Sequence, residues 1–533
     1  MGIKLTKLDE RLSVTGQIDI EDLHEIAASG YKSIICNRPD FEGGSDQPTS
    51  AQLESLAKSL GMVFVYLPVE IGAVSAEHGE KFKALVDALP GPILAFCGSG
   101  KRATALHHLA TQAVSANQQP VSDACNWSNA FDVVVIGGGS AGIGVTASLL
   151  KRRSSLRIAI IEPSDKHYYQ PAWTLVGGGA YDIAVTVRNM SAVIPASAQW
   201  IQAAAAGFEP DRNLVNLTDG RSIGYRQLII CPGIRLAWEK IEGLKETLGK
   251  NGVTSNYAYE LAPYTWSLVE NLKQGKALFT QPPMPIKCAG APQKAMYLSC
   301  DHWQRNHNLD KIEVEFNTAG AVLFGVADFV PPLMEYVKRY NAKLAFNSNL
   351  VKVDGVNKIA CFDIKDTAGN VKRVEKPFDM LHVTPPQVAP DFLRNSPLAD
   401  ASGFCEVDQK TLQHLRYANI FSLGDACSSP NAKTAAAIRK QIVVVAENIL
   451  AEKEDREFTT IYDGYGACPL TVEKGKVVLA EFGFGGRLLP TLPLKPTKPS
   501  AFAWLLKAKF FPWLYWNGML KGREWLARPR KSQ

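Results

Sequence analysis

Short apolar runs alternate with amphipathic stretches over the first 112 residues of the chain. The apolar runs lie in "SIICNRPD", "MVFVYLPVE" and "PILAF", and the stretches between them, "AQLESLAKSL" and "EHGEKFKALVDAL", carry apolar residues at helical spacing. Strands that alternate with helices are typical of an α/β domain. A polar stretch, "SANQQPVSDACNWSNA", follows this pattern and is interpreted as a linker.

A second α/β pattern begins at Phe131 with "FDVVVIGGGSAGIGVTASLL". An apolar strand runs into glycines at GxGxxG spacing and then into a helix, and the next strand, "LRIAIIEP", ends at Glu162. In this fingerprint the glycines let a pyrophosphate approach the helix N-terminus, and the acid accepts hydrogen bonds from a ribose 2′-OH. A cofactor with a 2′-phosphate is therefore disfavoured. The residues predicted to bind the dinucleotide are Gly137, Gly139, Ser140, Ala141, Gly142 and Glu162.

A later stretch, "YANIFSLGDACSSPNAKTAAAIRKQ", places a strand ahead of Gly424, Asp425 and a helix. It resembles the second FAD motif of flavoproteins with two dinucleotide folds, in which the aspartate holds the ribityl chain. "LIICPGIRL" resembles the turn into their second nucleotide fold, but the strand "GKALFTQPPMPIKCAGAPQKAMYL" carries no glycine triplet. We therefore predict FAD as the cofactor and a second fold that has lost nicotinamide binding. The added cofactor-binding candidates are Gly233, Gly424, Asp425, Lys433 and Thr434.

These patterns predict an α/β protein with a small phosphatase-like domain ahead of a Rossmann-like flavoprotein that has two dinucleotide-binding folds and amphipathic C-terminal helices. The expected segments are 1–112 for the small domain, 113–130 for the linker, 131–265 and 381–455 for the two parts of the FAD-binding domain, 266–380 for the second nucleotide-binding-like domain, and 456–533 for the C-terminal region.

Two cysteines of the flavoprotein part lie in surroundings that favour a reactive thiol. Cys288, in "PIKCAGAPQK", precedes a predicted helix and has Lys287 and Lys294 close by, and both features stabilise a thiolate. Cys468, in "DGYGACPL", lies between small residues that leave its side chain accessible. Taken singly, each is equally well explained as an inert loop thiol. The cysteines expected to have packing roles are Cys36, Cys231, Cys300, Cys361, Cys405 and Cys427.

The combination of motifs favours a catalytic role for both cysteines. "HYYQPAWTLVGGG", "PIKCAGAPQK", "LHVTPP", "GDACSSPNAKTAAA" and "YDGYGACPL", in this order after the FAD fingerprint, resemble the sulfide:quinone oxidoreductases of mitochondria and many bacteria, from about Phe131 to the C-terminus. The resemblance implies that two cysteines, Cys288 and Cys468 by motif, flank the flavin. It also implies that sulfide attacks the oxidised pair and leaves a persulfide on Cys468, while the Cys288 thiolate passes two electrons to the flavin and a membrane quinone accepts them.

The rival interpretation on the same fold is an NADH:quinone oxidoreductase. That enzyme would carry a second GxGxxG and would not need Cys288 or Cys468, and the sequence disagrees with it on both points.

The C-terminal segment carries the charge of the chain. From Ser500 onward seven lysines and arginines face one glutamate, which equals the whole net charge of +6. Pro512 interrupts the segment, and it contains no run of the roughly 18 to 20 apolar residues that a spanning helix needs. Aromatic residues interleaved with basic ones favour a membrane interface over nucleic acid. The candidates for membrane and quinone contact are Phe510, Phe511, Trp513, Tyr515 and Trp516.

Localisation and partners follow from the same features. The polar start "MGIKLTKLDE" is no secretory signal, and ten scattered cysteines do not form a disulfide framework. We expect a peripheral protein on the cytoplasmic side of the inner membrane, without a signal peptide or a metal. Its expected partners are sulfide, quinone and a sulfur acceptor, either a thiol or sulfite. The oligomeric state, including a homo-oligomer, stays open.

The loop "CGSGKRA" in the small domain joins a predicted strand to a predicted helix. Its backbone N–H groups and the helix N-terminus form an anion cradle that favours the Cys97 thiolate, and Arg102 adds a guanidinium. Four residues separate Cys97 from Arg102, as in rhodanese-like sulfur carriers, whereas phosphatase loops hold five. With "CNRPD", the loop resembles a small family of phosphatase-like folds assigned to sulfur transfer, over residues 3–112. Phosphatase activity, with Asp40 as general acid, is the alternative.

Overall fold

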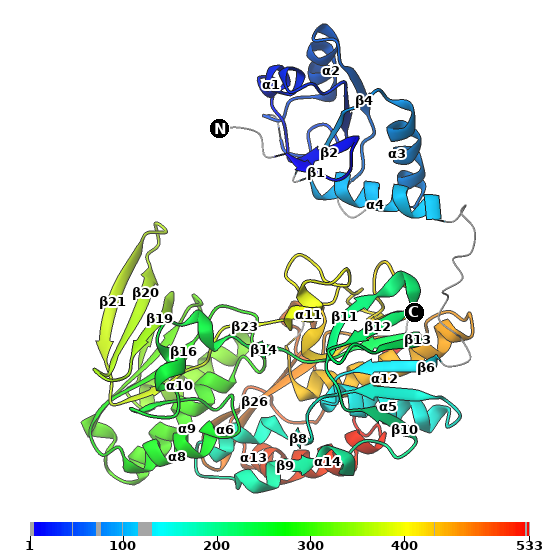
Figure 1. Cartoon of the computed structure of the whole chain (residues 1–533). Helices are drawn as coiled ribbons and strands as arrows, with labels where there is room; N and C mark the ends of the chain where they lie inside the picture. Colours follow the sequence, from blue (N-terminus) through cyan, green and yellow to red (C-terminus); the bar gives the residue numbers. More distant parts are fainter. Residues whose placement is uncertain are drawn as a thin grey trace. The chain divides into compact units, whose positions relative to one another are not determined.

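The computed structural model describes residues 5–44, 46–70, 76–98, 100–115, 130–430, 432–527 and 530–531. The chain separates into two compact units, Met1–Ser122 and Asp123–Gln533, called here the N-terminal unit and the C-terminal unit (Figure 1). Each has its own hydrophobic core.

The N-terminal unit is built on a five-stranded sheet in the order β1-β2-β5-β3-β4, in which only β1 is antiparallel to its neighbour. Its strands are β1 (Thr6–Lys7), β2 (Leu12–Thr15), β3 (Ser33–Cys36), β4 (Val63–Tyr66) and β5 (Ile93–Phe96). Its helices are α1 (Asp22–Ala28), α2 (Ser50–Ser59), α3 (Ala76–Ala88) and α4 (Lys101–Ser115).

Successive residues of these strands face opposite cores. Ile34 packs in one cluster with Leu23 of α1 and Leu53 of α2, and Ile35 packs in the other with Phe82 of α3. Helices therefore cover both faces, as strands buried on both sides require. This arrangement confirms the predicted α/β class for the N-terminal unit.

A seven-stranded sheet organises the first half of the C-terminal unit. Its order is β10-β7-β6-β13-β12-β11, and β24 pairs with β13 in parallel, so a strand from late in the chain completes the sheet. Its strands are β6 (Phe131–Ile136), β7 (Ile158–Ile161), β10 (Ala198–Ile201), β11 (Ala205–Glu209), β12 (Leu214–Leu217), β13 (Ser222–Ile230) and β24 (Ile420–Ser422).

Two long helices, α5 (Ser140–Arg152) and α12 (Ala435–Lys453), pack against each other beside this sheet (Figure 1). α5 follows β6 directly, and α12 follows β24 after a short connection. Their N-termini therefore both lie beyond the carboxyl ends of parallel strands, the edge at which open α/β sheets bind ligands.

A second, fully parallel sheet has the order β15-β22-β16-β17-β18. Its strands are β15 (Val253–Thr254), β16 (Gly275–Gln281), β17 (Ile312–Thr318), β18 (Lys343–Ala345) and β22 (Met380–His382). The helices near it are α8 (Leu261–Asn271), α9 (Ala291–Arg305) and α10 (Val330–Arg339). Because β15 precedes residue 266 and α8 begins before it, this sheet takes chain from the N-terminal side of the predicted boundary.

Two antiparallel pieces complete the C-terminal unit. The three-stranded meander has the order β19-β20-β21 and projects at one end of the unit (Figure 1), and the hairpin β26–β27 packs against α9. The strands are β19 (Ser348–Asp354), β20 (Ile359–Lys365), β21 (Val371–Pro377), β26 (Gly466–Glu473) and β27 (Lys476–Phe482). The remaining short elements are β8 (Lys166–Tyr168), β9 (Val187–Asn189), β14 (Arg235–Leu236), β23 (Gln387–Val388), β25 (Thr460–Ile461), β28 (Arg530–Lys531), α6 (Trp173–Val176), α7 (Leu244–Thr247) and α11 (Asp391–Arg394).

The chain ends in short helices: α13 (Ala501–Leu505), a π-helical turn (Leu506–Phe510), α14 (Phe511–Asn517) and a 3₁₀ turn (Met519–Lys521). Ser500 caps α13 by accepting a hydrogen bond from the Ala503 N–H, and Pro512 lies in the first turn of α14, directly after the π-helical turn. Nowhere in the described ranges is a helix both long and apolar enough to span a bilayer.

Candidate functional site

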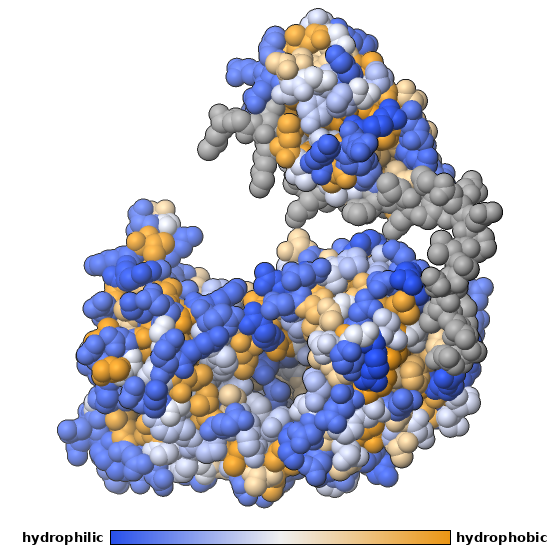
Figure 2. Space-filling model, viewed as in Figure 1, coloured by the Kyte–Doolittle hydropathy of each residue, from blue (hydrophilic) through white to orange (hydrophobic). Residues whose placement is uncertain are grey.

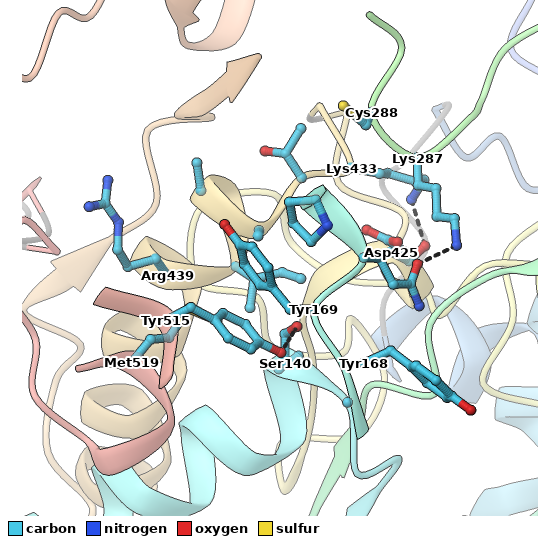
Figure 3. A pocket seen from close by; sticks show the side chains of 18 of the residues that line it. Ser140, Tyr168, Tyr169, Lys287, Cys288, Asp425, Lys433, Arg439, Tyr515 and Met519 are labelled. Atoms are coloured by element: carbon cyan, nitrogen blue, oxygen red, sulfur yellow. Dashed lines mark hydrogen bonds between the residues drawn. The ribbon is translucent and has the colours of Figure 1, made fainter. Parts of the chain in front are cut away.

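A cavity of about 460 Å³ opens where the N-termini of α5 and α12 meet the loop before α9 and the C-terminal helices (Figure 3). Residues from most of the predicted flavoprotein motifs line it, and none comes from "LHVTPP". They are Gly137, Gly139, Ser140, Ala141, Glu162, Gly233, Cys288, Asp425, Lys433, Thr434, Phe511 and Tyr515. The predicted residues that do not line it are Gly142, Gly424, Cys468, Phe510, Trp513 and Trp516.

The glycine loop after β6 has the shape that a pyrophosphate needs. Gly137 has a φ of +104°, and a Cβ there would lie 2.5 Å from the Cys231 carbonyl oxygen. A Cβ on Gly142 would lie 1.8 Å from the Gly137 carbonyl oxygen. Neither position tolerates a side chain, so the backbone of the glycine loop can approach a ligand closely.

Glu162 follows β7 and holds this loop. Its carboxylate accepts hydrogen bonds from the Gly138 N–H at 2.7 Å and from the Ser164 N–H at 2.8 Å. Each oxygen keeps a second lone pair, so a ribose hydroxyl can still donate to it.

Asp425 brings an unpaired polar atom to the cavity from the turn after β24. Its Oδ1 is buried and has no hydrogen-bond partner, and burial raises the pKa of this carboxyl. Lys433 fixes the backbone of the turn, because its Nζ donates to the carbonyl oxygens of Asp425 at 2.7 Å and Cys427 at 3.1 Å (Figure 3). Thr434 caps α12 by accepting from the Ala437 N–H at 3.2 Å. A buried aspartate oxygen without a partner calls for a donor from a ligand.

These features together fit FAD. The bare glycine loop and the N-terminus of α5 suit the pyrophosphate, Glu162 suits a ribose, and the free Asp425 oxygen suits the hydroxyls of the ribityl chain. The N-terminus of α12, whose first residues line the cavity, adds a second positive dipole end.

Cys288 and Cys468 come together beside this cavity from parts of the chain 180 residues apart. Cys288 lies between β16 and α9, Cys468 lies on β26, and their Sγ atoms are 3.8 Å apart. The two thiols are free, and the distance is close contact without a covalent bond, which would need about 2.05 Å. Since α9 packs on β26, the two elements hold the sulfurs next to each other.

The backbone of Cys288 is strained. Its φ is +50°, a left-handed conformation that few residues other than glycine adopt. Its N–H donates to the Lys433 carbonyl oxygen at 2.8 Å, and its own carbonyl accepts from the Ala291 N–H at 2.7 Å. These bonds tie the thiol loop both to the turn that carries Asp425 and to the start of α9.

Two buried lysines lie near the sulfur pair. Lys294 Nζ is 3.1 Å from Cys288 Sγ and 3.9 Å from Cys468 Sγ, and Lys507 donates to the Pro469 carbonyl oxygen at 3.4 Å. The predicted helper Lys287 instead donates to Gln170 (Figure 3), so of the two lysines flanking the thiol in sequence only Lys294 contacts it.

The surroundings shift the pKa values of the two thiols in opposite directions. The pKa of Cys288 lies well below its usual range, because Cys468 hydrogen-bonds to it and both lysines attract its negative charge. The same hydrogen bond, together with burial, raises the pKa of Cys468. Burial and the repulsion from Lys294 lower the pKa of Lys507 to about 7. Cys288 is therefore the thiolate of the pair and the better leaving group.

Lys507 is a cavity residue that the sequence did not single out. Within the basic tail it reads as an anchor for lipid headgroups, but it lies in the π-helical turn, is buried, and lines the cavity. π-helical turns inside helices frequently occur at functional sites, but this turn can be recognised only from the structure.

The aromatic tail residues divide between the interior and the surface. Tyr515 is 3% exposed and its hydroxyl contacts His167 Nε2 at 2.6 Å and Ser140 Oγ at 2.7 Å. Trp516 is 5% exposed, with the Arg188 guanidinium 4.0 Å above its ring. These two candidates for membrane or quinone contact are therefore buried at the glycine-loop end of the unit, and Tyr515 also lines the cavity. Trp513 is 48% exposed, and Phe510 stacks on its ring.

In the N-terminal unit, Cys97 and Arg102 lie together after β5 and at the start of α4. Cys97 is buried, and the Arg102 guanidinium forms a two-point ion pair with Glu42, at 2.9 and 2.6 Å. Arg38 also donates to Glu42, at 3.0 Å. Burial raises the pKa of the neighbouring Cys36 thiol to about 12.

Hydrogen bonds from one serine occupy both oxygens of the Asp40 carboxylate. Its two carboxylate oxygens accept from the Ser50 N–H at 2.7 Å and the Ser50 hydroxyl at 2.8 Å. It therefore anchors the start of α2, which weakens the case for a general acid.

Comparison with known proteins separates the two units in the same way. Residues 4–115 match the family "Beta-lactamase hydrolase-like protein, phosphatase-like domain", and residues 131–269 match "Pyridine nucleotide-disulphide oxidoreductase". The beta-lactamase hydrolase-like protein of Agrobacterium fabrum is 35% identical over 107 residues, which is 20% of this chain and 25% of that protein.

The larger match covers most of the chain. The mitochondrial sulfide:quinone oxidoreductase of Mus musculus is 40% identical over 414 residues, which is 78% of this chain and 92% of that protein. The crystal structure of the sulfide:quinone oxidoreductase from Aquifex aeolicus shares the fold, with a TM-score of 0.61 and 20% identity over 72% of this chain and 91% of that one. The chain belongs to the sulfide:quinone oxidoreductase family.

Proposed function

We propose that the C-terminal unit oxidises sulfide and passes the electrons to a membrane quinone. The observation that carries this proposal is the pair Cys288 and Cys468, 3.8 Å apart beside a cavity whose residues fit FAD. FAD, when bound, accepts an electron pair and gives it to the quinone.

The thiols supply the sulfur chemistry. In their oxidised, disulfide-linked form, a hydrosulfide ion attacks Cys468 Sγ, a new S–S bond forms, and the bond to Cys288 breaks. Cys468 then carries the persulfide and Cys288 leaves as a thiolate with the electron pair of the broken bond. Lys294, at 3.1 Å, stabilises this leaving thiolate, and the low pKa of Cys288 fits that role.

The C-terminal helices suit a membrane surface near the cavity. Apolar residues gather at the edge of the unit where α13 lies (Figure 2). The exposed apolar side chains there are Phe502, Leu505, Trp513, Trp525 and Leu526. Phe511 and Leu514 of the same helices line the cavity, so a lipophilic quinone could pass from this surface to the flavin. We propose peripheral attachment through this apolar edge.

The test is anaerobic addition of sulfide to the FAD-loaded protein while the flavin absorbance is followed. We expect rapid bleaching in the wild type and a loss of at least about 1,000-fold in rate for Cys288→Ser and Cys468→Ser, because neither can form the disulfide. Cys300→Ser, a buried thiol of α9 in the core, is the matched control and should bleach normally. Rapid bleaching in both redox variants would disprove the proposal.

A second test concerns the apolar edge. Trp513→Glu places a charge on an exposed aromatic position, and we expect weaker flotation with vesicles made of phosphatidylcholine and an anionic lipid. Val371→Glu, an exposed apolar position on the meander, is the control that should leave flotation unchanged.

For the N-terminal unit we propose sulfur transfer at Cys97. The Cys97 thiolate attacks the outer sulfur of a persulfide, so that sulfur moves to Cys97 and the donor thiol is released without net oxidation. The specific observation is that Ser50 hydrogen-bonds both oxygens of Asp40, which weakens Asp40 as the general acid of the rival phosphatase reaction. Mass spectrometry after turnover with sulfide and quinone should find one added sulfur on Cys97. Hydrolysis of phosphate esters that is lost in Cys97→Ser would favour the phosphatase instead.

A further inference from the structure

A buried carboxylate lies in the cavity on the strand paired with that of Cys468, opposite Ala467. Glu481, on β27, is 4% exposed and lines the cavity. Its Oε1 accepts from the Tyr465 hydroxyl at 2.5 Å, and its Oε2 accepts from the Thr491 N–H at 3.1 Å. Among the ion pairs of the described residues, none involves this glutamate. A buried acid without a cation partner in a ligand cavity is a candidate for proton transfer.

The hydrogen bonds around Glu481 run in one direction. Tyr465 has a single hydroxyl hydrogen, which it donates to Glu481. The 3.1 Å contact between the Tyr465 and Thr491 hydroxyls must then be a bond donated by Thr491. The chain of donors leads from Thr491 through Tyr465 to the carboxylate.

Thr491 connects this chain to a second cavity. That cavity, of about 700 Å³, is lined by Lys440, Asp463, Thr491, Glu524 and other residues of the C-terminal region. Thr491 lines both cavities. Charged side chains at this second cavity can hold water at the start of the chain, and the main cavity receives its end.

We propose that Thr491, Tyr465 and Glu481 form a proton relay that serves quinone reduction in the main cavity. This inference rests on the proposed function. Reduction of a quinone to a quinol consumes two electrons and two protons, and the electrons arrive from the sulfur chemistry while the protons come from water. For each proton, the Glu481 carboxylate first takes the Tyr465 hydroxyl proton, Tyr465 takes the Thr491 proton, and Thr491 takes one from water in the second cavity. The resulting Glu481 carboxyl then protonates a quinone oxygen and returns to the carboxylate.

The groups around the relay keep its members in the required forms. Burial and the charge of Glu481 raise the pKa of Tyr465, which keeps its hydroxyl protonated as a donor. Arg439 Nη2 lies 3.5 Å from the Tyr465 hydroxyl, and Lys440 Nζ lies 4.1 Å from the centre of its ring. Asp463 accepts from the Tyr465 N–H at 3.2 Å, and Lys507 lines the same cavity.

The experiment separates the two half-reactions in the FAD-loaded protein. For Glu481→Gln we expect sulfide to bleach the flavin at the wild-type rate, whereas reoxidation by a soluble quinone slows about 100-fold, the effect of losing a general acid. Glu473→Gln is the matched control, since Glu473 is a buried glutamate of the same hairpin that pairs with Arg339 and Lys476 and does not line the cavity. It should reoxidise normally.

Two further measurements keep the test decisive. Thr491→Val removes the relay hydroxyl but keeps the N–H that Glu481 accepts, and we expect reoxidation to slow about 10-fold. In the infrared difference spectrum between oxidised and reduced protein, a carboxyl C=O band should disappear in Glu481→Gln and stay in Glu473→Gln.

The relay is disproved if Glu481→Gln reoxidises at the wild-type rate, or if Thr491→Val does so while its infrared band is unchanged. Failure of the proposed function looks different, because sulfide would then not bleach the wild-type flavin. In that case, flavin reduced by dithionite still reports whether quinone reoxidation depends on Glu481.

Discussion

Both units carry a thiol beside cationic side chains, but the cations are paired differently. In the C-terminal unit, Lys294 contacts Cys288 and Cys468, and no carboxylate of the described residues forms an ion pair with it. In the N-terminal unit, the Arg102 guanidinium next to Cys97 is already bound by Glu42. A cation without a carboxylate partner can act fully on the sulfur, whereas a paired one mainly sets position.

This difference separates two kinds of thiol chemistry. The lysines stabilise the negative charge that forms on Cys288 when the disulfide opens, which suits a redox pair. The arginine held by Glu42 gives a fixed frame around a single thiol, which suits a site that accepts and releases one sulfur atom. Substitutions that add or remove a cation should therefore affect the two sites by different amounts.

The largest effect should come from Lys294→Met. A charge-assisted hydrogen bond is worth roughly 1.5 to 3 kcal/mol, so we expect flavin bleaching by sulfide to slow about 10- to 100-fold. Lys276→Met, which removes an exposed lysine paired with Glu313, is the control. Equal rates in Lys294→Met and the wild type would mean that the lysine does not act on the leaving thiolate.

A smaller effect of opposite sign should follow from Glu42→Gln. With Glu42 neutral, Arg102 and Arg38 are free to attract the Cys97 thiolate, and alkylation of Cys97 by iodoacetamide at pH 7 should become about tenfold faster. Glu54→Gln, at a surface pair with Lys58, is the control. Slower alkylation would show that Glu42 is needed to hold Arg102 against the thiol.

The smallest effect concerns pH and Lys507. Its pKa of about 7 means that the ammonium is charged below pH 7 and mostly neutral above it, so its stabilisation of the Cys288 thiolate is lost as pH rises through 7. The alkylation rate of Cys288 should therefore show an inflection near pH 7, of about threefold, that Lys507→Met lacks. An identical profile in the variant would assign the inflection to another group.

The same residue predicts a change in stability. Because burial lowers the pKa of Lys507 in the folded state, the unfolded chain binds more protons between pH 7 and the ordinary lysine range. The free energy of unfolding should rise with pH across that window more steeply in the wild type than in Lys507→Met. Urea unfolding at several pH values measures this difference, and parallel curves would contradict the burial.

Local motifs made much of the flavoprotein fold predictable. The glycines at 137, 139 and 142 and the acid at 162 act through adjacent backbone, so their spacing alone predicts a strand, a turn and a helix. The α/β class of both units follows from the same alternation of apolar runs and helical stretches. The pairing of Cys288 with Cys468 came from a family resemblance, since no spacing rule relates residues 180 positions apart.

The rest depended on packing between distant segments. Tyr515 and Trp516 read as surface anchors because aromatic and basic residues alternate in the tail, but only the folded tail shows that α14 turns them toward His167 and Arg188. Lys507 and Glu481 are buried in the part of the unit where α13 packs on β27, which no local pattern reveals. The Asp40 carboxylate could not be known to serve Ser50 until α2 was placed.

The most direct test of the central claim is a peptide map of the oxidised, FAD-loaded protein under non-reducing conditions. If the two sulfurs are a redox pair, the peptides that contain Cys288 and Cys468 must be recovered joined, directly or through added sulfur, and must separate after sulfide and a reductant. Recovery of both peptides unlinked, with each thiol open to alkylation in protein that still bleaches with sulfide, would contradict the account.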